Sequence, residues 1–280
     1  MRWTRAVDIG ESRVCMRTGS VPVEGVWNAG PVPVALITGP TAGIGRAFAT
    51  ALAAEGHDLV LVSRDKARLE QVSADLSSAY GVACEVLPAD LSDAEQTLNV
   101  ERYLAENPVD VLVNNAGFGK RLPFEANDIE AEQECFDVLV TAVMRLTHAA
   151  LGPMRRRGRG DIINVSSVAG FLPRGTYGAH KAWVISFSRW AHLRYRKDGL
   201  RVMALCPGFV RTEFHQRMDA NLSGIPGFMW LDADRLAGDA LEDLRAGKAV
   251  SIPSKRWKAV VTVSRLAPNR LVERVARRGR

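Results

Sequence analysis

The chain has 280 residues, of which 47% are hydrophobic, and a mean hydropathy of −0.05, as expected for a soluble globular protein without low-complexity blocks. The net charge of +6 is concentrated at one end, because residues 251–280 carry nine basic side chains and one acidic one, a net +8, which leaves −2 for the rest. This distribution argues against a nucleic-acid-binding body, and a polyanion, if bound, should meet the tail.

Cysteine spacing and the N-terminus indicate the compartment. The four cysteines, Cys15, Cys84, Cys135 and Cys206, form no C-x-x-C pair, which predicts neither a metal site nor a disulfide framework and favours a reducing cytoplasm. Residues 1–31 lack an apolar segment of signal-peptide length, and the chain has no run of 18 apolar residues. We expect a protein that is neither secreted by that route nor membrane-spanning, with residues 1–31 as a poorly ordered extension or an over-long start.

From residue 32 onward, apolar β-branched runs alternate with stretches of helical periodicity. Strands are predicted at 32–39, 58–64, 82–87, 109–117, 161–167 and 200–208, and helices at 43–56, 65–79, 93–106, 129–157 and 177–197. Strands separated by helices of this length imply βαβ units. The sequence therefore predicts an α/β fold with a doubly wound parallel sheet, Rossmann-like, in three α/β/α layers within a single domain over 32–250. Such sheets bind ligands at the carboxyl ends of their strands.

The first such loop reads TGPTAGIG, residues 38–45, between a predicted strand and a predicted helix. Gly39, Gly43 and Gly45 would allow a tight turn and a close approach of the backbone to a pyrophosphate at the helix N-terminus. The alternative is a simple tight turn, but the strand–turn–helix context favours nucleotide binding.

A second pattern lies in TYGAHK, residues 176–181. Tyr177 and Lys181 are four residues apart and would share one face of a helix, where the ammonium group would lower the pKa of the phenol. Alone, such a pair is more often a solvated helix face, so its meaning depends on the surrounding motifs.

Six motifs in register resemble those of the short-chain dehydrogenase/reductase family, over roughly residues 33–215. They are TGPTAGIG (38–45), ADLSD (89–93), NNAG (114–117), NVSSVAG (164–170), YGAHK (177–181) and PGFVRT (207–212). The resemblance implies a nicotinamide-dependent oxidoreductase. It assigns Tyr177 as the general acid or base, Lys181 as its electrostatic partner that also binds the nicotinamide ribose, and Ser167 as the donor to the substrate oxygen, with Ser166 as the alternative serine.

The same resemblance implies the cofactor contacts. They are Gly39, Thr41, Gly43, Ile44 and Gly45 at the phosphates, Asp90 and Leu91 at the adenine, Asn115, Ala116 and Gly117 along the cofactor, Tyr177 and Lys181 near the nicotinamide, and Pro207, Gly208, Val210 and Thr212 over it. Structural alternatives exist, since Asp90 could cap a helix and Pro207-Gly208 could simply end a strand. The family also implies a homodimer or homotetramer formed through the helices at 129–157 and 177–197.

Cofactor preference is read at the end of the second strand. An acid there usually selects NAD by accepting the ribose hydroxyls, but this chain has Ser63 followed by Arg64. A serine and a guanidinium can hold a 2′-phosphate, which predicts NADP(H) over NAD(H). Asp65 could soften this preference, and Arg64 could be a plain surface residue.

Two features depart from the family pattern. The interval from Ser167 to Tyr177 is about three residues shorter than in most members, which suggests a more open pocket. Leu139 stands where many members have an asparagine that supports a water leading to the lysine, so the proton relay is in question. His148 and His180 lie nearby in sequence, but lone histidines on helices are more often packed or surface residues than relays.

The C-terminal third contains a predicted substrate lid and a basic tail that could bind a membrane or a partner subunit. Residues 213–236 are glycine-punctuated and apolar, as in a mobile lid over a hydrophobic substrate, although they could instead cover the core. The tail, 251–280, alternates arginines with apolar groups in two predicted amphipathic helices broken near Pro268. These could lie on an anionic membrane surface, or pack on the domain or a partner subunit.

The sequence therefore predicts a cytoplasmic, NADP(H)-dependent oxidoreductase that interconverts a carbonyl and an alcohol on a fairly apolar small molecule, with a membrane-peripheral location as the alternative. The competing interpretation is a nucleotide-binding regulatory protein of the same fold with little or no turnover, favoured by Leu139 and the short loop.

Overall fold

The computed structural model describes residues 32–119, 124–173, 175–212 and 226–266, within a compact unit that begins at Val32. The predictions for residues 1–31, for residues 213–225 of the expected lid and for residues 267–280 of the tail lie outside these ranges.

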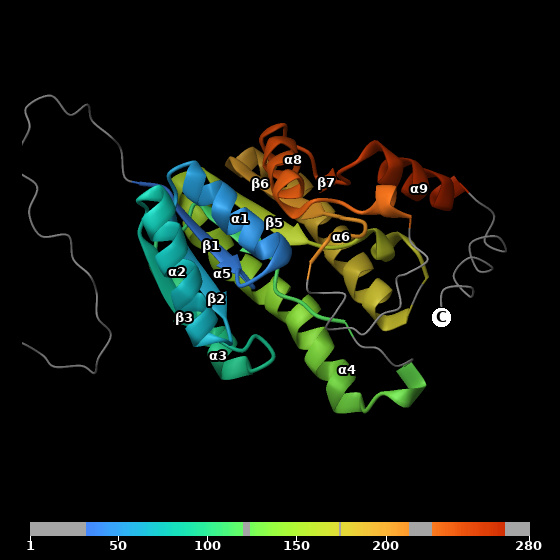
Figure 1. Ribbon diagram of the computed structural model, residues 1–280, viewed down its shortest axis with the longest axis horizontal. Helices are drawn as coiled ribbons and strands as arrows, with labels where there is room; N and C mark the ends of the chain where they lie inside the picture. Colours follow the sequence, from blue (N-terminus) through green and yellow to red (C-terminus); the bar gives the residue numbers. More distant parts are fainter. Residues whose placement is uncertain (1–31, 120–123, 174, 213–225, 267–280) are drawn as a thin grey trace, which may run out of the picture. The chain divides into compact units, whose positions relative to one another are not determined.

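A seven-stranded parallel sheet forms the centre of this unit (Figure 1). Its strands are β1 Val34–Thr38, β2 Asp58–Ser63, β3 Cys84–Pro88, β4 Val111–Asn114, β5 Gly160–Val165, β6 Leu200–Leu205 and β7 Val250–Ser251. They lie in the order β3-β2-β1-β4-β5-β6-β7, and each neighbouring pair runs parallel. The winding reverses between β1 and β4, which is where open parallel sheets form their ligand crevice.

Helices cover both faces of the sheet. They are α1 Gly43–Ala54, α2 Lys66–Tyr80, α3 Ala94–Glu106, α4 Ile129–Phe136, α5 Ala142–Arg157, α6 Gly175–Tyr195, α8 Ala233–Arg245 and α9 Lys255–Leu266. One core cluster joins the sheet to α1, α2 and α8, and a second joins its other face to α3, α5 and α6. The predicted three-layer α/β/α fold is thereby confirmed.

Local sequence signals start and stop several of these helices. Asp65, Asp93 and Asp232 are N-caps whose carboxylates accept hydrogen bonds from backbone N–H groups of α2, α3 and α8. Gly81 and Gly158 end α2 and α5 in the left-handed conformation that glycine adopts without strain.

The predicted elements match the observed ones closely up to β6, with two differences in the helices. The long helix has the expected span of 129–157, but a π-helical segment, Asp137–Thr141, separates α4 from α5. Helix α6 begins at Gly175, two residues before Tyr177. Strand β7 and helix α8 were not predicted as elements.

The region predicted as lid and tail contains ordered parts of the domain. Helix α8 begins at Ala233, and its Leu236 is buried, so any mobile lid ends before residue 233. Ser251 pairs with Leu205 in the sheet, and Trp257 of α9 is also buried. Residues 251–266 are therefore part of the fold.

The helix that runs from Ile129 to Arg157 is the one candidate membrane span among the described residues, judged by length and composition alone. The 18-residue window that qualifies is 56% buried inside the fold. A core helix of a soluble protein gives the same signal, so this helix is weak evidence for a membrane location.

Candidate active site

Thr38 joins the loops that follow β1 and β4. Its hydroxyl accepts hydrogen bonds from the backbone N–H groups of Asn115 and Ala116, both at 2.9 Å. The Asn115 amide donates in turn to the carbonyl oxygens of Thr38 and Gly39, at 2.9 Å and 3.0 Å. Asn115, predicted to lie along the cofactor, therefore holds the glycine loop in place.

The glycine loop has the geometry that a bound diphosphate requires. Gly39 and Gly43 have φ of 67° and 56°, and a β-carbon on Gly45 would lie 2.1 Å from the Gly39 carbonyl oxygen. The N-cap of α1, Ala42, makes no side-chain hydrogen bond, and the first turn of α1 contains no acid. Its N–H groups thus have no capping side chain, in contrast to the aspartate-capped α2, α3 and α8, which suits a ligand phosphate.

The loop after β6 contacts the glycine loop. A β-carbon on Gly43 would lie 2.7 Å from Thr212 Cγ2, so this predicted nicotinamide-loop residue packs on the glycine turn. Val210 is buried and bridges to Leu231, and Ile44 packs on the core. Thr41 is half-buried at the turn itself.

Arg64 extends from the end of β2 with its side chain 62% exposed. Its guanidinium lies 3.4 Å from the Asp90 carboxylate and 3.8 Å from that of Glu134. Burial of Asp90 would raise the pKa of its carboxyl, but hydrogen bonds from Ser92 and the charge of Arg64 outweigh it and hold that pKa below its usual range. Asp90 does not cap α3, because Asp93 does, and Leu91 beside it is buried.

Ser167 and Tyr177 meet beyond the end of β5. The Ser167 hydroxyl accepts a hydrogen bond from the Ala169 N–H at 3.1 Å and is hydrogen-bonded to the Tyr177 phenol. Burial, the largest influence, raises the pKa of the phenol above its ordinary value; the bond with Ser167 lowers it, and the neighbouring Cys135 thiol raises it. The net shift is upward.

Lys181 is buried one helical turn further on. Its Nζ donates to the Val165 carbonyl oxygen at 2.8 Å and lies 5.7 Å from the centroid of the Tyr177 ring. Burial lowers the pKa of Lys181 to about 8, against opposing effects of Cys135 and Cys206. The sequence predicts a lowered Tyr177 pKa, but the net shift is upward, because burial of the phenol dominates.

Ser166 points away from this cluster. It is buried and its hydroxyl donates to the backbone carbonyl oxygen of Lys181 at 2.7 Å, which ties α6 to the end of β5. The geometry thus separates the two serines, with Ser167 beside the phenol and Ser166 supporting the helix.

Sequence reasoning missed a buried polar network beneath the site. Asn114 donates to Asn164 at 2.8 Å and to Thr147 at 3.2 Å, and Asn164 donates to Ser188 at 2.9 Å. All four side chains are buried, and they join β4, β5, α5 and α6. A possible signal was that Asn114 and Asn164 interrupt otherwise apolar strands at positions directly opposite each other.

Leu139 lies in the π-helical segment and is fully buried with Cys135 and Val140, against the partly buried Tyr177. A β-carbon on Gly117 would lie 2.8 Å from Leu139 Cδ2 and 4.0 Å from Lys181 Nζ. An apolar side chain therefore stands where the family pattern has a polar one.

The two histidines near this region occupy other surroundings than the position of the family's asparagine. His148 is exposed on α5, whereas His180 packs edge-on against Phe136 with ring centroids 5.4 Å apart. Burial lowers the pKa of His180, with a smaller raising effect from Glu132 and a lowering effect from Lys181.

Trp257 of α9 supports the loop that holds Pro207 and Gly208. A β-carbon on Gly208 would lie 2.0 Å from Trp257 Cε2, and the indole N–H donates to the Met229 carbonyl oxygen at 3.0 Å. The Pro207 carbonyl oxygen accepts from the Val168 N–H at 3.0 Å, which links this loop to the one after Ser167. Trp257 was not predicted to lie near the site.

The glycine turn, the uncapped helix α1 and the serine–tyrosine–lysine cluster define an α/β protein built to bind a dinucleotide. Comparison with known proteins assigns it more narrowly. The model of the short chain dehydrogenase family matches residues 33–223, and the chain belongs to that family of oxidoreductases.

Several curated relatives are very-long-chain 3-oxoacyl-CoA reductases. A very-long-chain 3-oxoacyl-CoA reductase from Anas platyrhynchos is 33% identical over 217 residues, which cover 75% of this chain and 66% of that protein. The human protein of the same name is 32% identical over 64% of this chain and 60% of its own length. The chain thus spans about two thirds or less of these curated relatives.

Among solved structures, a short-chain dehydrogenase from Sphingobium yanoikuyae in complex with NADPH has a TM-score of 0.77 and 35% identity, and the match covers 84% of this chain and 94% of that one. A bulky-bulky ketone specific alcohol dehydrogenase from Comamonas testosteroni has a TM-score of 0.73 and 30% identity, over 84% and 92% of the two chains. A nicotinamide cofactor fits the glycine turn described above.

Proposed function

We propose that this protein is an NADP(H)-dependent oxidoreductase that interconverts a carbonyl and an alcohol on a fairly apolar small molecule. The observation that carries the proposal is the grouping of Ser167, Tyr177 and Lys181 at the carboxyl end of β5, through the Ser167–Tyr177 hydrogen bond and the bond from Lys181 to Val165. Each group can perform a step that such a reaction needs.

For reduction, the nicotinamide supplies the hydride, and the protein must supply a proton and hold the carbonyl oxygen. The raised pKa of Tyr177 keeps the phenol protonated at neutral pH, so it can donate that proton. Ser167 donates a hydrogen bond to the same oxygen, and Lys181 presents its amine from one helical turn away. In the reverse direction the Tyr177 phenolate is the base.

Preference for NADP(H) over NAD(H) is supported by Arg64. Its guanidinium is largely exposed at the end of β2, where Ser63 replaces an acid, and two fixed N–H donors can hold a 2′-phosphate. The NADPH complex of the Sphingobium relative is in line with this preference. We also propose that the glycine loop holds the phosphates, that Asp90 and Leu91 contact the adenine, and that the loop from Pro207 to Thr212 covers the nicotinamide.

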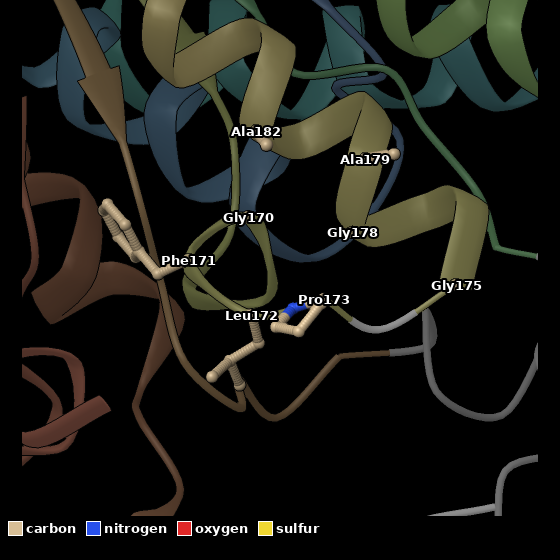
Figure 2. A pocket seen from close by; sticks show the side chains of 8 residues that line it. All are labelled: Gly170, Phe171, Leu172, Pro173, Gly175, Gly178, Ala179 and Ala182. Atoms are coloured by element: carbon tan, nitrogen blue, oxygen red, sulfur yellow. The ribbon is translucent and has the colours of Figure 1, made fainter. Parts of the chain in front are cut away.

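An apolar substrate is supported by the relatives' names and by a hollow beside the Ser167–Tyr177 loop. Its volume is about 340 Å³, and Figure 2 shows Phe171, Leu172 and Pro173 on one side, with Gly178 and Ala182 of α6 on the other. We propose a 3-oxoacyl thioester or a bulky ketone as the substrate class.

A regulatory protein that binds the nucleotide without turnover is the second candidate. It is favoured by Leu139, whose buried side chain brings no polar atom to the space between Gly117 and Lys181. Turnover that depends on Tyr177 would exclude it.

Assembly and location complete the proposal. An aromatic ladder on α6, in which Trp183 stacks on Phe187 at 4.8 Å and Phe187 contacts Trp190 at 5.8 Å, leaves Trp190 53% exposed and supports a homodimer or homotetramer through this face. Among the described residues, Cys84 and Cys206 form no disulfide, which supports a reducing, cytoplasmic location.

The test is a thermal-shift comparison of NADPH, NADP, NADH and NAD, followed by turnover on a panel that contains a 3-oxoacyl thioester, a bulky ketone and a small polar ketone. Stabilisation by the phosphorylated cofactors with turnover of the apolar substrates supports the proposal. Equal stabilisation by all four nucleotides would remove the cofactor preference, and binding without turnover would favour the regulatory protein.

A further inference from the structure

Helix α9 is attached to the domain along one side only. Trp257 and Val261 are 6% and 4% exposed, whereas Val260, Val263 and Leu266 are 40%, 66% and 80% exposed. At about 100° per residue, these last three residues, three apart, form a slanted stripe that begins at the edge of the buried side with Val260, roughly 60° from Trp257, and reaches the opposite side with Leu266, roughly 180° from it. Within the described part of the chain, this stripe is left open to solvent.

The stripe is bordered by positive charge. Helix α9 contains Lys255, Arg256, Lys258 and Arg265 and no acid, and all four side chains are exposed. None of the four forms an ion pair with a carboxylate among residues 32–119, 124–173, 175–212 and 226–266. The sequence that follows, residues 267–280, adds five arginines and one glutamate.

Exposed apolar residues continue next to the helix. Phe228 is 60% exposed, and the Arg256 guanidinium lies 5.4 Å from its ring centroid while donating to the Phe228 carbonyl oxygen at 2.6 Å. Apolar groups at the centre with basic groups around them are the pattern of a helix that lies in the interface of an anionic membrane.

We infer that α9 docks this protein on an anionic lipid surface, with Val260, Val263 and Leu266 inserted and the basic side chains against the headgroups. The charge distribution supports this occupant, because residues 251–280 carry +8 and the rest of the chain −2. A neutral or basic partner would not use that concentration of charge.

Helix α9 lies next to the proposed substrate hollow, which suggests why the protein would dock on a membrane. This part of the inference rests on the proposed apolar substrate. The Arg265 guanidinium lies 4.6 Å from the centroid of Phe171, which lines the apolar hollow beside the Ser167–Tyr177 loop. At its other end, Trp257 packs on Gly208. A docked α9 therefore brings the loops that carry Phe171 and Gly208, and with them the proposed substrate hollow, next to the membrane, where long apolar substrates dissolve.

The test is co-sedimentation of the full chain with two kinds of vesicle, pure phosphatidylcholine and phosphatidylcholine with roughly 30% phosphatidylserine. We expect binding to the second kind, weakened when NaCl is raised from about 0.1 M to about 1 M. Lys255→Gln with Lys258→Gln should lower the partition coefficient by about fivefold per charge. Val263→Glu with Leu266→Glu should lower it by more than about tenfold.

The control is Ile129→Glu, because Ile129 is 65% exposed on α4, as Val263 is on α9. It should bind as the wild type does, and the circular dichroism and Tm of every variant should match the wild type. The inference would be overturned if the wild type did not bind the anionic vesicles. It would also be overturned if the Val263/Leu266 variant bound them as strongly as the wild type. A change in solution mass in that variant would overturn it as well, because the stripe would then be a contact between copies. Vesicle binding needs no turnover, so the two proposals can fail separately. The protein could catalyse the proposed reaction without binding vesicles, or bind vesicles without catalysing the reaction.

Discussion

The indole of Trp257 fills the space beside Gly208, where a β-carbon would lie 2.0 Å from Cε2 and 2.2 Å from Nε1. The ring also contacts Phe209, with centroids 5.5 Å apart. Residues 49 positions apart in the sequence thus fix the loop that is expected to cover the nicotinamide. The glycine is required because no side chain fits under the indole.

Gly208→Ala should therefore displace either the loop or α9. We expect a loss of about 1–3 kcal/mol in the free energy of unfolding, as for other overpacked sites, and a weaker affinity for NADPH. Urea unfolding and NADPH titration measure both effects. The matched control is Gly238→Ala in α8, where a β-carbon would meet nothing within 4 Å. Equal behaviour of the two variants would show that the Trp257 contact does not position the loop.

Leu139→Asn should destabilise the protein. Leu139 is 0% exposed and packs among apolar groups, so an amide there loses the packing of the leucine and buries polar atoms. We expect a loss of about 2–5 kcal/mol by urea unfolding, with a smaller loss, under about 1.5 kcal/mol, for the volume-conserving Leu139→Met. Unchanged stability together with a raised kcat would instead mean that the site accepts a polar relay.

Lys181 should make stability depend on pH in alkaline solution. Its pKa is about 8 in the folded chain and 10.5 as an ordinary lysine, so between these values the unfolded chain binds more protons. Stability must then rise with pH in that window, relative to a Lys181→Met variant. Between about pH 7.5 and pH 9.5 the difference should change by about 2 kcal/mol in favour of the wild type. If the difference in unfolding free energy between the wild type and Lys181→Met stayed constant or fell as the pH rose, the lowered pKa of Lys181 would be contradicted.

Arg64→Ala should lower kcat/KM for NADPH by about tenfold or more, since hydrogen bonds to a charged group contribute about 1.5–3 kcal/mol. The value for NADH should change by less than about twofold, because no 2′-phosphate is lost. Arg102→Ala is the control, as Arg102 is an exposed arginine on α3 whose guanidinium donates to Asn99. Equal losses with both cofactors would assign Arg64 a structural role with Asp90.

Much of this arrangement could be predicted from the sequence, because it depends on local patterns. Alternating apolar runs and helical stretches predict the sheet and its layers, and Gly39, Gly43 and Gly45 mark a turn that only glycine can make. Helical spacing puts Tyr177 and Lys181 on one face of a helix, and the surrounding motifs mark that face as part of the site.

The remainder depends on contacts between distant segments. The direction of the Tyr177 pKa shift follows from burial, which the helical spacing of Tyr177 and Lys181 does not reveal. From the sequence, Trp257 is predicted to be part of a basic tail. In the structure β7 joins the edge of the sheet, so α9 and Trp257 pack on the domain. Ser166 and Ser167 have the same side chain, and only the bond from Ser166 to the Lys181 carbonyl oxygen distinguishes their positions.

The proposed reaction is tested most directly by the steady-state kcat of wild type and Tyr177→Phe for NADPH oxidation with a 3-oxoacyl thioester or bulky ketone. Phenylalanine keeps the ring that packs near Leu139 and removes only the proton donor. We expect kcat to fall by about 10²–10⁴-fold, as for the loss of a general acid, with NADPH binding and Tm preserved. Turnover within about threefold of the wild type would contradict the assignment of Tyr177 as the proton donor.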